Sequence, residues 1–280
     1  MLQVIKEIPA LRRWYYKLSA PTRIKRFKPD LSRAVRKNRE TLRLVSRWIE
    51  EDVYQASIFQ YGLPPQIRNY IDESIDDTPT YSDLIVHLAG GLSDLRYLEL
   101  GPSVGKNLFQ VAMSVRNAEL LAVDIEDINP ILESRLAFKS REAWKTMPGS
   151  KRVGLSTQTT YDLEGNRVEY IAGDLFDRAT WERLRGRKFN LIFSDAFHSP
   201  DALLLEWENV SRLRLLAEGP FAMVWDDLNS KEMREAFCNI ATQIQRVRPS
   251  AVTSLELLSG WVGKRERPHP IGIVRDLGTG

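Results

Sequence analysis

Cysteine is almost absent from this chain of 280 residues: Cys238 is its single cysteine. Histidine is also scarce, with three residues. A single cysteine excludes an internal disulfide and a zinc site built from several thiolates, so we expect a protein of the reducing cytoplasm. No apolar run reaches the roughly 18–20 residues that cross a bilayer. Lys6, Glu7 and Pro9 interrupt the first apolar segment, which argues against a secretory signal peptide.

Charge is nearly balanced in total but unevenly distributed. Residues 1–50, the basic arm, hold 14 of the 40 Lys and Arg residues and 4 of the 37 Asp and Glu residues, a net charge of +10. The other 230 residues hold 26 and 33, a net charge of −7. Aromatic residues such as Trp14 and Phe27 accompany the cations. This composition suits binding to nucleic acid or an anionic membrane, or a solvated helix face that packs on the body or on a second subunit.

Apolar spacing predicts helices before residue 92. Leu31 and Val35 begin a stripe with helical spacing, and the preceding Asp30 is a candidate N-cap. Further helices are expected near residues 66–75 and 81–88, the second of them ending at a pair of glycines.

From residue 93 the pattern changes to alternating strands and helices. Seven short apolar runs predict strands at residues 97–100, 120–123, 168–171, 191–193, 221–224, 252–258 and 271–274. The alternation predicts an α/β fold, a mostly parallel sheet with helices on both faces. The last two strands lack a helix between them, so the last strand is expected to be antiparallel. Glu164-Gly-Asn166 predicts an additional hairpin before the third strand.

These patterns divide the chain into two parts. Residues 1–92 are expected to form a basic arm and a helical lid or cap, and residues 93–280 the α/β domain. Residues 54–61, which include two glutamines and two tyrosines, are the expected lining of a substrate site.

Acidic residues close three successive strands of the predicted sheet. Glu99 ends the first strand, and the glycines at 101 and 105 permit close approach of the backbone to a ligand before the next helix. Asp124 and Asp174 close the second and third strands. At such positions one carboxylate can accept ribose hydroxyls and the other an adenine amino group, and each could also cap the helix that follows.

Residues 80–275 resemble the class I S-adenosylmethionine-dependent methyltransferases. Glu99-x-Gly101-x-x-x-Gly105 is similar to the first motif of that family, with Ser103 where many members have another glycine. The resemblance implies a Rossmann-like sheet of seven strands with an antiparallel last strand. It also implies that S-adenosyl-L-methionine is bound by Glu99, Gly101, Ser103, Gly105, Asp124, Asp174, Leu175 and Asp195.

Acidic residues also follow the fourth and fifth strands, which are neighbours in such a sheet. Asp195 is followed by His198, and Asp226 and Asp227 form a pair. Three crowded carboxylates repel one another unless protons or a cation intervene, and Mg²⁺ prefers oxygen ligands. Alternatively, Asp195 binds only the cofactor and His198 begins a helix.

The pattern Asp-x-x-His followed by an acidic pair is similar to the metal-dependent sugar and natural-product O-methyltransferases. These are the macrocin and mycinamicin type and the related cephalosporin-pathway family. The resemblance implies Mg²⁺ bound by Asp195, Asp226 and Asp227, with His198, neutral near pH 7, as general base. Many of those relatives have Glu at the position of Asp226. We therefore expect O-methylation of a small hydroxylated molecule such as a sugar or natural product.

The sequence fits other functions less well. An NAD(P)-dependent oxidoreductase is disfavoured because Gly101 and Gly105 do not form G-x-G-x-x-G. A metal-independent methyltransferase could act on RNA or another macromolecule bound through the basic arm, and a scaffold protein would be expected to lack the acidic residues above. A homo-oligomer through the N-terminal helices is a further expectation. His269 is expected in a loop near the mouth of the site.

Overall fold

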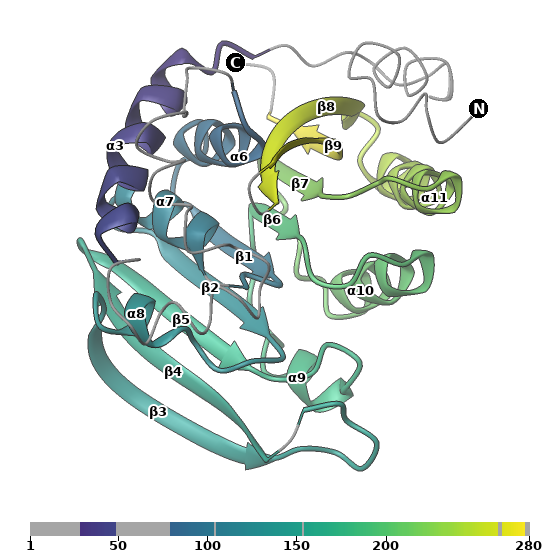
Figure 1. Ribbon diagram of the computed structural model, residues 1–280. Helices are drawn as coiled ribbons and strands as arrows, with labels where there is room; N and C mark the ends of the chain where they lie inside the picture. Colours follow the sequence, from purple (N-terminus) through teal and green to yellow (C-terminus); the bar gives the residue numbers. More distant parts are fainter. Residues whose placement is uncertain (1–28, 49–78, 104, 153, 263–264, 278–280) are drawn as a thin grey trace.

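The computed structural model describes residues 29–48, 79–103, 105–152, 154–262 and 265–277 (Figure 1). The predictions made for residues 1–28 and 49–78, including the helix near 66–75 and the lining at 54–61, lie outside the described residues. None of the described helices is long and apolar enough to cross a membrane.

The helices are α3 (Ser32–Trp48), α6 (Tyr81–Gly90), α7 (Lys106–Ser114), α8 (Pro130–Glu133), α9 (Arg178–Glu182), α10 (Pro200–Arg212) and α11 (Lys231–Val247). The strands are β1 (Arg96–Leu100), β2 (Glu119–Asp124), β3 (Ala137–Lys145), β4 (Leu155–Leu163), β5 (Asn166–Ala172), β6 (Leu191–Ser194), β7 (Phe221–Trp225), β8 (Val252–Val262) and β9 (Arg265–Asp276).

The strands form one sheet in the order β3-β4-β5-β2-β1-β6-β7-β9-β8. Adjacent strands are parallel throughout the central run β5-β2-β1-β6-β7. β9 is antiparallel to both β7 and β8. The predicted Rossmann-like sheet with an antiparallel last strand is therefore confirmed. It is the sheet that the resemblance to class I methyltransferases implies.

The described residues place nine strands in the sheet, two more than the seven apolar runs predicted, and the hairpin expected before the third strand accounts for β4. The turn expected at Glu164 and Gly165 joins β4 to β5, with φ angles of 52° and 80°. Positive φ at both positions suits a two-residue hairpin turn. β3 pairs with β4 at the edge of the sheet, and nearly all of its side chains are exposed. β3 was not predicted because it lacks the apolar alternation that reveals a half-buried strand.

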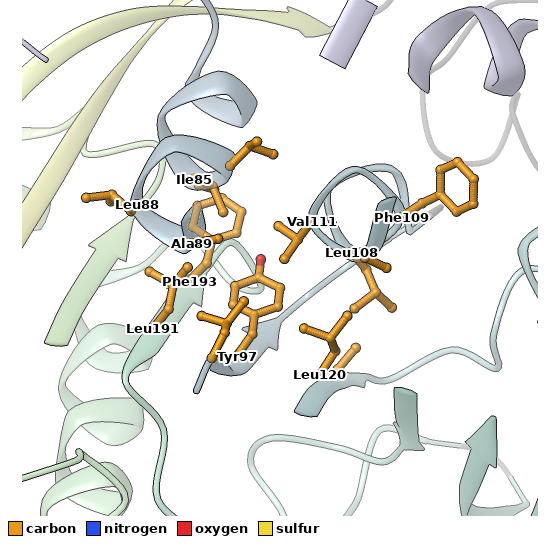
Figure 2. Packing of buried hydrophobic residues seen from close by; sticks show 14 of the residues in the cluster. Ile85, Leu88, Ala89, Tyr97, Leu108, Phe109, Val111, Leu120, Leu191 and Phe193 are labelled. Atoms are coloured by element: carbon orange, nitrogen blue, oxygen red, sulfur yellow. The ribbon is translucent and has the colours of Figure 1, made fainter. Parts of the chain in front are cut away.

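Helices cover both faces of the sheet. On one face, Ile85 and Ala89 of α6 and Val111 of α7 pack on Tyr97 and Phe193 (Figure 2). On the other face, α9, α10 and α11 bury a second apolar cluster against the same strands. Figure 1 shows this arrangement of layers around the central strands.

A buried polar cluster joins α3 to the start of α6. The carboxylate of Asp83 accepts hydrogen bonds from the Asn38 amide at 2.7 Å and from two nitrogens of Arg39 at 3.3 Å. It also accepts the backbone N–H of Thr80 at 2.7 Å, as part of a capping box. These contacts fix the first turn of α6, and its first residue, Tyr81, contacts the candidate site.

Candidate functional site

The turn after β1 lies against the loop after β6. Gly101 has a φ of 79°, and a Cβ atom on it would overlap the backbone of Ala196. Gly105 has a φ of 78°, and a Cβ atom there would overlap the side chain of Leu132. The left-handed backbone favours glycine at both positions, and at Gly101 the backbone of Ala196 also leaves no room for a side chain. Close approach of a ligand to this turn stays a prediction.

Glu99 is fully buried at the end of β1. The hydroxyl of Tyr97 donates to Oε2 at 3.0 Å, but Oε1 has no hydrogen-bond partner among the described residues. Burial raises the pKa of Glu99 to about 8, although the Tyr97 hydroxyl and the nearby Asn107 side chain favour the charged form. A buried acceptor without a donor calls for an explanation. The ammonium group of S-adenosylmethionine would supply such a donor, so this residue fits the cofactor.

Asp124 holds the turn that carries the first motif. Its Oδ2 accepts the backbone N–H of Ser103 at 2.9 Å, and its Oδ1 accepts that of Glu126 at 3.0 Å. Ser103 has a φ of 53°, in the left-handed region. Burial raises the pKa of Asp124, while the two backbone N–H groups oppose this rise. Each carboxylate oxygen retains a lone pair that can accept a hydroxyl of a ligand.

Asp174 is buried and its carboxylate is already bonded within the protein. Oδ1 accepts the backbone N–H of Phe176 at 2.9 Å, and Oδ2 accepts that of Lys151 at 2.7 Å and the hydroxyl of Ser150 at 3.2 Å. Asp174 therefore anchors the connection between β3 and β4 at this edge of the sheet. The adjacent Leu175 accepts a hydrogen bond from an indole through its carbonyl oxygen. Adenine binding by these two residues stays a prediction.

The structure brings the four predicted residues of the metal and base site together. Asp195 follows β6, and Asp226 and Asp227 follow the neighbouring β7. Nε2 of His198 lies 3.1 Å from Oδ1 of Asp195, and Nδ1 lies 3.3 Å from Oδ2 of Asp227. A half-exposed imidazole thus stands between two carboxylates at the carboxyl ends of adjacent strands.

This arrangement changes the expected charge of His198. Burial lowers its pKa, but Asp195 and Asp227 together outweigh that effect and raise the pKa to about 9. Burial and the charge of Asp226 raise the pKa of Asp195 to about 7. The expectation of a neutral His198 near pH 7 therefore does not hold for the metal-free cluster. A bound divalent cation would lower the pKa of His198, because the positive charge of the cation favours the neutral imidazole.

His269 was expected in a loop, but it lies on β9 and is buried. Its Nδ1 is 3.1 Å from both carboxylate oxygens of Asp226 and 3.0 Å from Oδ1 of Asp227. β9 runs antiparallel to β7 and extends past its carboxyl end, which brings His269 level with the acidic pair. The antiparallel last strand was predicted, but the pairing register that places this residue was not.

Sequence reasoning also missed Tyr81 and Lys106. The ring of Tyr81 lies 5.1 Å from that of His269, and the ammonium of Lys106 lies 5.6 Å from the centre of the Tyr81 ring. Burial lowers the pKa of Lys106, while Asp195 opposes this shift. Both residues could have been found from the sequence, because they are the first residues of α6 and α7. Helices that start at this edge of the sheet begin beside the site.

A groove of about 970 Å³ lies elsewhere, at the amino ends of β1 and β2. Arg33, Arg36 and Lys37 of α3 line it, together with Arg116. The three cations of α3, which belong to the basic arm, therefore lie away from the acidic cluster at the carboxyl ends of the strands.

No protein-family model matches the chain, and no curated protein is significantly similar to it in sequence. Similar solved structures include an O-methyltransferase from Bacillus cereus in complex with SAH, with 14% identity and a TM-score of 0.49 over 82% of this chain and 91% of that chain. TomG from Streptomyces achromogenes, an O-methyltransferase involved in tomaymycin synthesis, has 13% identity and a TM-score of 0.43 over 82% and 91%. The plantazolicin methyltransferase BpumL has 11% identity and a TM-score of 0.45 over 89% and 100%.

Proposed function

We propose that this chain is an S-adenosylmethionine-dependent methyltransferase that methylates a hydroxyl group of a small molecule. The observation that carries the proposal is the meeting of Glu99, Asp124 and Asp195 at the carboxyl ends of three adjacent parallel strands. Open α/β sheets bind their ligands at this edge.

The residues at this edge have complementary tasks toward the cofactor. Glu99 would accept a hydrogen bond from the ammonium group of the cofactor through its unpartnered oxygen. Asp124 would accept hydrogen bonds from the ribose hydroxyls. Asp174 and Leu175 would border the adenine. When bound, S-adenosylmethionine supplies an electrophilic methyl group on sulfur.

The acidic cluster would hold the divalent cation. Asp226 and Asp227 lie side by side in the chain, and Asp195 is close enough to Asp226 for its pKa to respond to that charge. Asp226 is buried and the side chains of Asp195 and Asp227 are partly exposed. Carboxylates gathered in this way repel one another, so their chemistry fits a cation with oxygen ligands such as Mg²⁺. When bound, the cation lowers the pKa of a substrate hydroxyl and fixes its position.

His198 would take the proton from the substrate hydroxyl. Its side chain is 41% exposed, so a substrate can reach it, and Asp195 and Asp227 stabilise the imidazolium ion that proton transfer produces. The same carboxylates keep the ring protonated at neutral pH in the metal-free protein. We therefore propose that His198 acts as a base only when cation binding has offset the charge of Asp227.

A cofactor-consumption screen tests this function. Hydroxylated metabolites, with RNA as a macromolecular alternative, would be incubated with S-adenosylmethionine and Mg²⁺ or with a chelator. The proposal expects turnover of a small hydroxylated substrate that falls by about 10²–10⁴ in His198→Ala. Turnover that neither chelator nor this substitution changes would contradict the metal and base roles, and turnover of RNA alone would contradict the small-molecule substrate.

A further inference from the structure

We infer that His269 is a metal ligand, and that Asp226, Asp227 and His269 form a site that binds a divalent transition metal such as Mn²⁺ or Co²⁺ more tightly than Mg²⁺. The inference rests on the proposed function, because it concerns the cation that would serve the same reaction. It differs from the expected Mg²⁺ site in one ligand, since a nitrogen atom replaces the carboxylate of Asp195.

The distances between the donor atoms suit one cation. Nδ1 of His269 lies 3.0–3.1 Å from oxygens of both aspartates, and donor atoms of all three residues lie within 4.8 Å of one another. Two ligands on adjacent corners of an octahedron with bonds of about 2.1 Å are separated by about 3.0 Å. The histidine is therefore spaced from each carboxylate as adjacent ligands would be.

The backbone holds these donors in place. His269 lies between two prolines, whose φ angles are fixed, and Leu228 N–H donates to the carbonyl of Pro270 at 3.0 Å. Asp227 has a φ of 53°, and this left-handed residue lies between Asp226 and Leu228. β9 and the end of β7 thus form one rigid unit around the three side chains.

The three side chains differ in how far they are exposed to solvent. The side chains of His269 and Asp226 are 6% and 2% exposed, whereas that of Asp227 is 25% exposed. A cation held here would be enclosed on one side and open on the side of Asp227, where a substrate oxygen could approach. Only one ring nitrogen of His269 has a partner among the described residues: Nδ1 contacts the two aspartates, and Nε2 has no hydrogen-bond partner there.

Asp195 contributes to a different contact. It faces His198 at 3.1 Å and is not part of the ligand group found among the described residues. An all-oxygen set, which Mg²⁺ prefers, is thus replaced by two carboxylates and one imidazole. Imidazole ligands favour first-row transition metals, and affinity rises from Mn²⁺ to Co²⁺ in the Irving–Williams order.

A protonated His269 held by both carboxylates would give the same distances without a metal. Metal titrations of the full-length, chelator-treated protein separate the two explanations. We expect Mn²⁺ and Co²⁺ to bind at least about tenfold more tightly than Mg²⁺ in calorimetry. We also expect pulsed electron paramagnetic resonance of the Mn²⁺-loaded wild type to detect coupling to a directly bound ¹⁴N nucleus.

Two variants identify the residue that supplies the metal-bound nitrogen. His269→Asp should remove the ¹⁴N coupling and bring the affinities for Mn²⁺ and Mg²⁺ closer together, because it restores an all-oxygen site. His198→Ala is the matched control, since it removes the neighbouring imidazole, and it should keep both the coupling and the metal preference. If His269→Asp does not fold, the wild type and His198→Ala still decide whether the bound nitrogen belongs to the other histidine.

Several results would overturn the inference. These are equal affinity for Mg²⁺ and Mn²⁺, absence of ¹⁴N coupling, its loss in His198→Ala, or no metal binding at all. S-adenosylmethionine binding would be measured in the same preparations without metal. Cofactor binding without transition-metal preference contradicts the role of His269 alone, whereas metal binding without cofactor binding contradicts the proposed function.

Discussion

Nε2 of His198 lies 3.1 Å from Oδ1 of Asp195, and this contact largely sets the charge of the candidate base. In Asp195→Asn the carboxylate charge is lost, so the pKa of His198 should fall from about 9 toward the ordinary 6.5. An NMR titration of the imidazole in metal-free protein measures the change, with His87 as the internal reference. An unchanged His198 pKa would show that Asp195 does not hold the ring.

The same shift predicts a pH dependence of stability. Because the folded pKa of about 9 exceeds the ordinary value of 6.5, the protonated ring stabilises the fold fully below pH 6.5. This stabilisation is lost as the pH rises through 9. The melting temperature of metal-free wild type should therefore decline over this range more than that of His198→Gln. Equal declines in the two proteins would contradict this contribution.

Gly101 should be intolerant of any side chain. In Gly101→Ala the new Cβ overlaps the backbone of Ala196, so the turn after β1 must separate from the loop after β6. Gly149→Ala is the matched control, because Gly149 also has a positive φ, 90°, but has open space around it. In this control the free energy of unfolding should fall by only about 1–2 kcal/mol, because of backbone strain. Equal losses in chemical unfolding would show that the contact with Ala196 is unimportant.

The buried pair of Arg39 and Asp83 should be essential to the docking of α3. Asp83→Ala leaves the guanidinium without its carboxylate partner, and removing one partner of a buried pair costs about 3–5 kcal/mol. Lys231 and Glu235 form an exposed pair, so Glu235→Ala should cost no more than about 0.5 kcal/mol. Denaturant unfolding of both variants gives the comparison, and similar losses would contradict the structural role of Asp83.

Asp174 should hold the connection between β3 and β4. Asp174→Ala removes the acceptor for the Lys151 N–H and the Ser150 hydroxyl, so residues 147–152 should be cleaved faster in limited proteolysis. Ser150→Ala removes only one of these bonds and should have a smaller effect. Unchanged cleavage in Asp174→Ala would leave adenine binding as the better explanation of this carboxylate.

The positions of the acidic residues could be predicted because they depend on order along the chain. Parallel strands end at the same edge, so Glu99, Asp124, Asp195 and Asp226 could be assigned there before any side-chain geometry was known. The apolar runs also identified the central strands, since these are buried on both faces.

The remaining features depend on contacts between distant segments. The place of His269 follows from the register of β9 on β7, and no local pattern encodes that register. The raised pKa of His198 in the metal-free cluster follows from carboxylates in the loops after two different strands. β3 has almost no buried face, so its pairing with β4 left no periodicity in the sequence.

Cofactor titration tests the central claim most directly. Isothermal calorimetry of the full chain should show saturable binding of S-adenosylmethionine and none of NAD. The affinity should increase from pH 6.5 to 8.5, because Glu99, with a pKa of about 8, must ionise to bind an ammonium group. Glu99→Gln should weaken binding by about tenfold or more and abolish this pH dependence. Absence of saturable binding in the wild type, or unchanged affinity in Glu99→Gln at both pH values, would contradict the account.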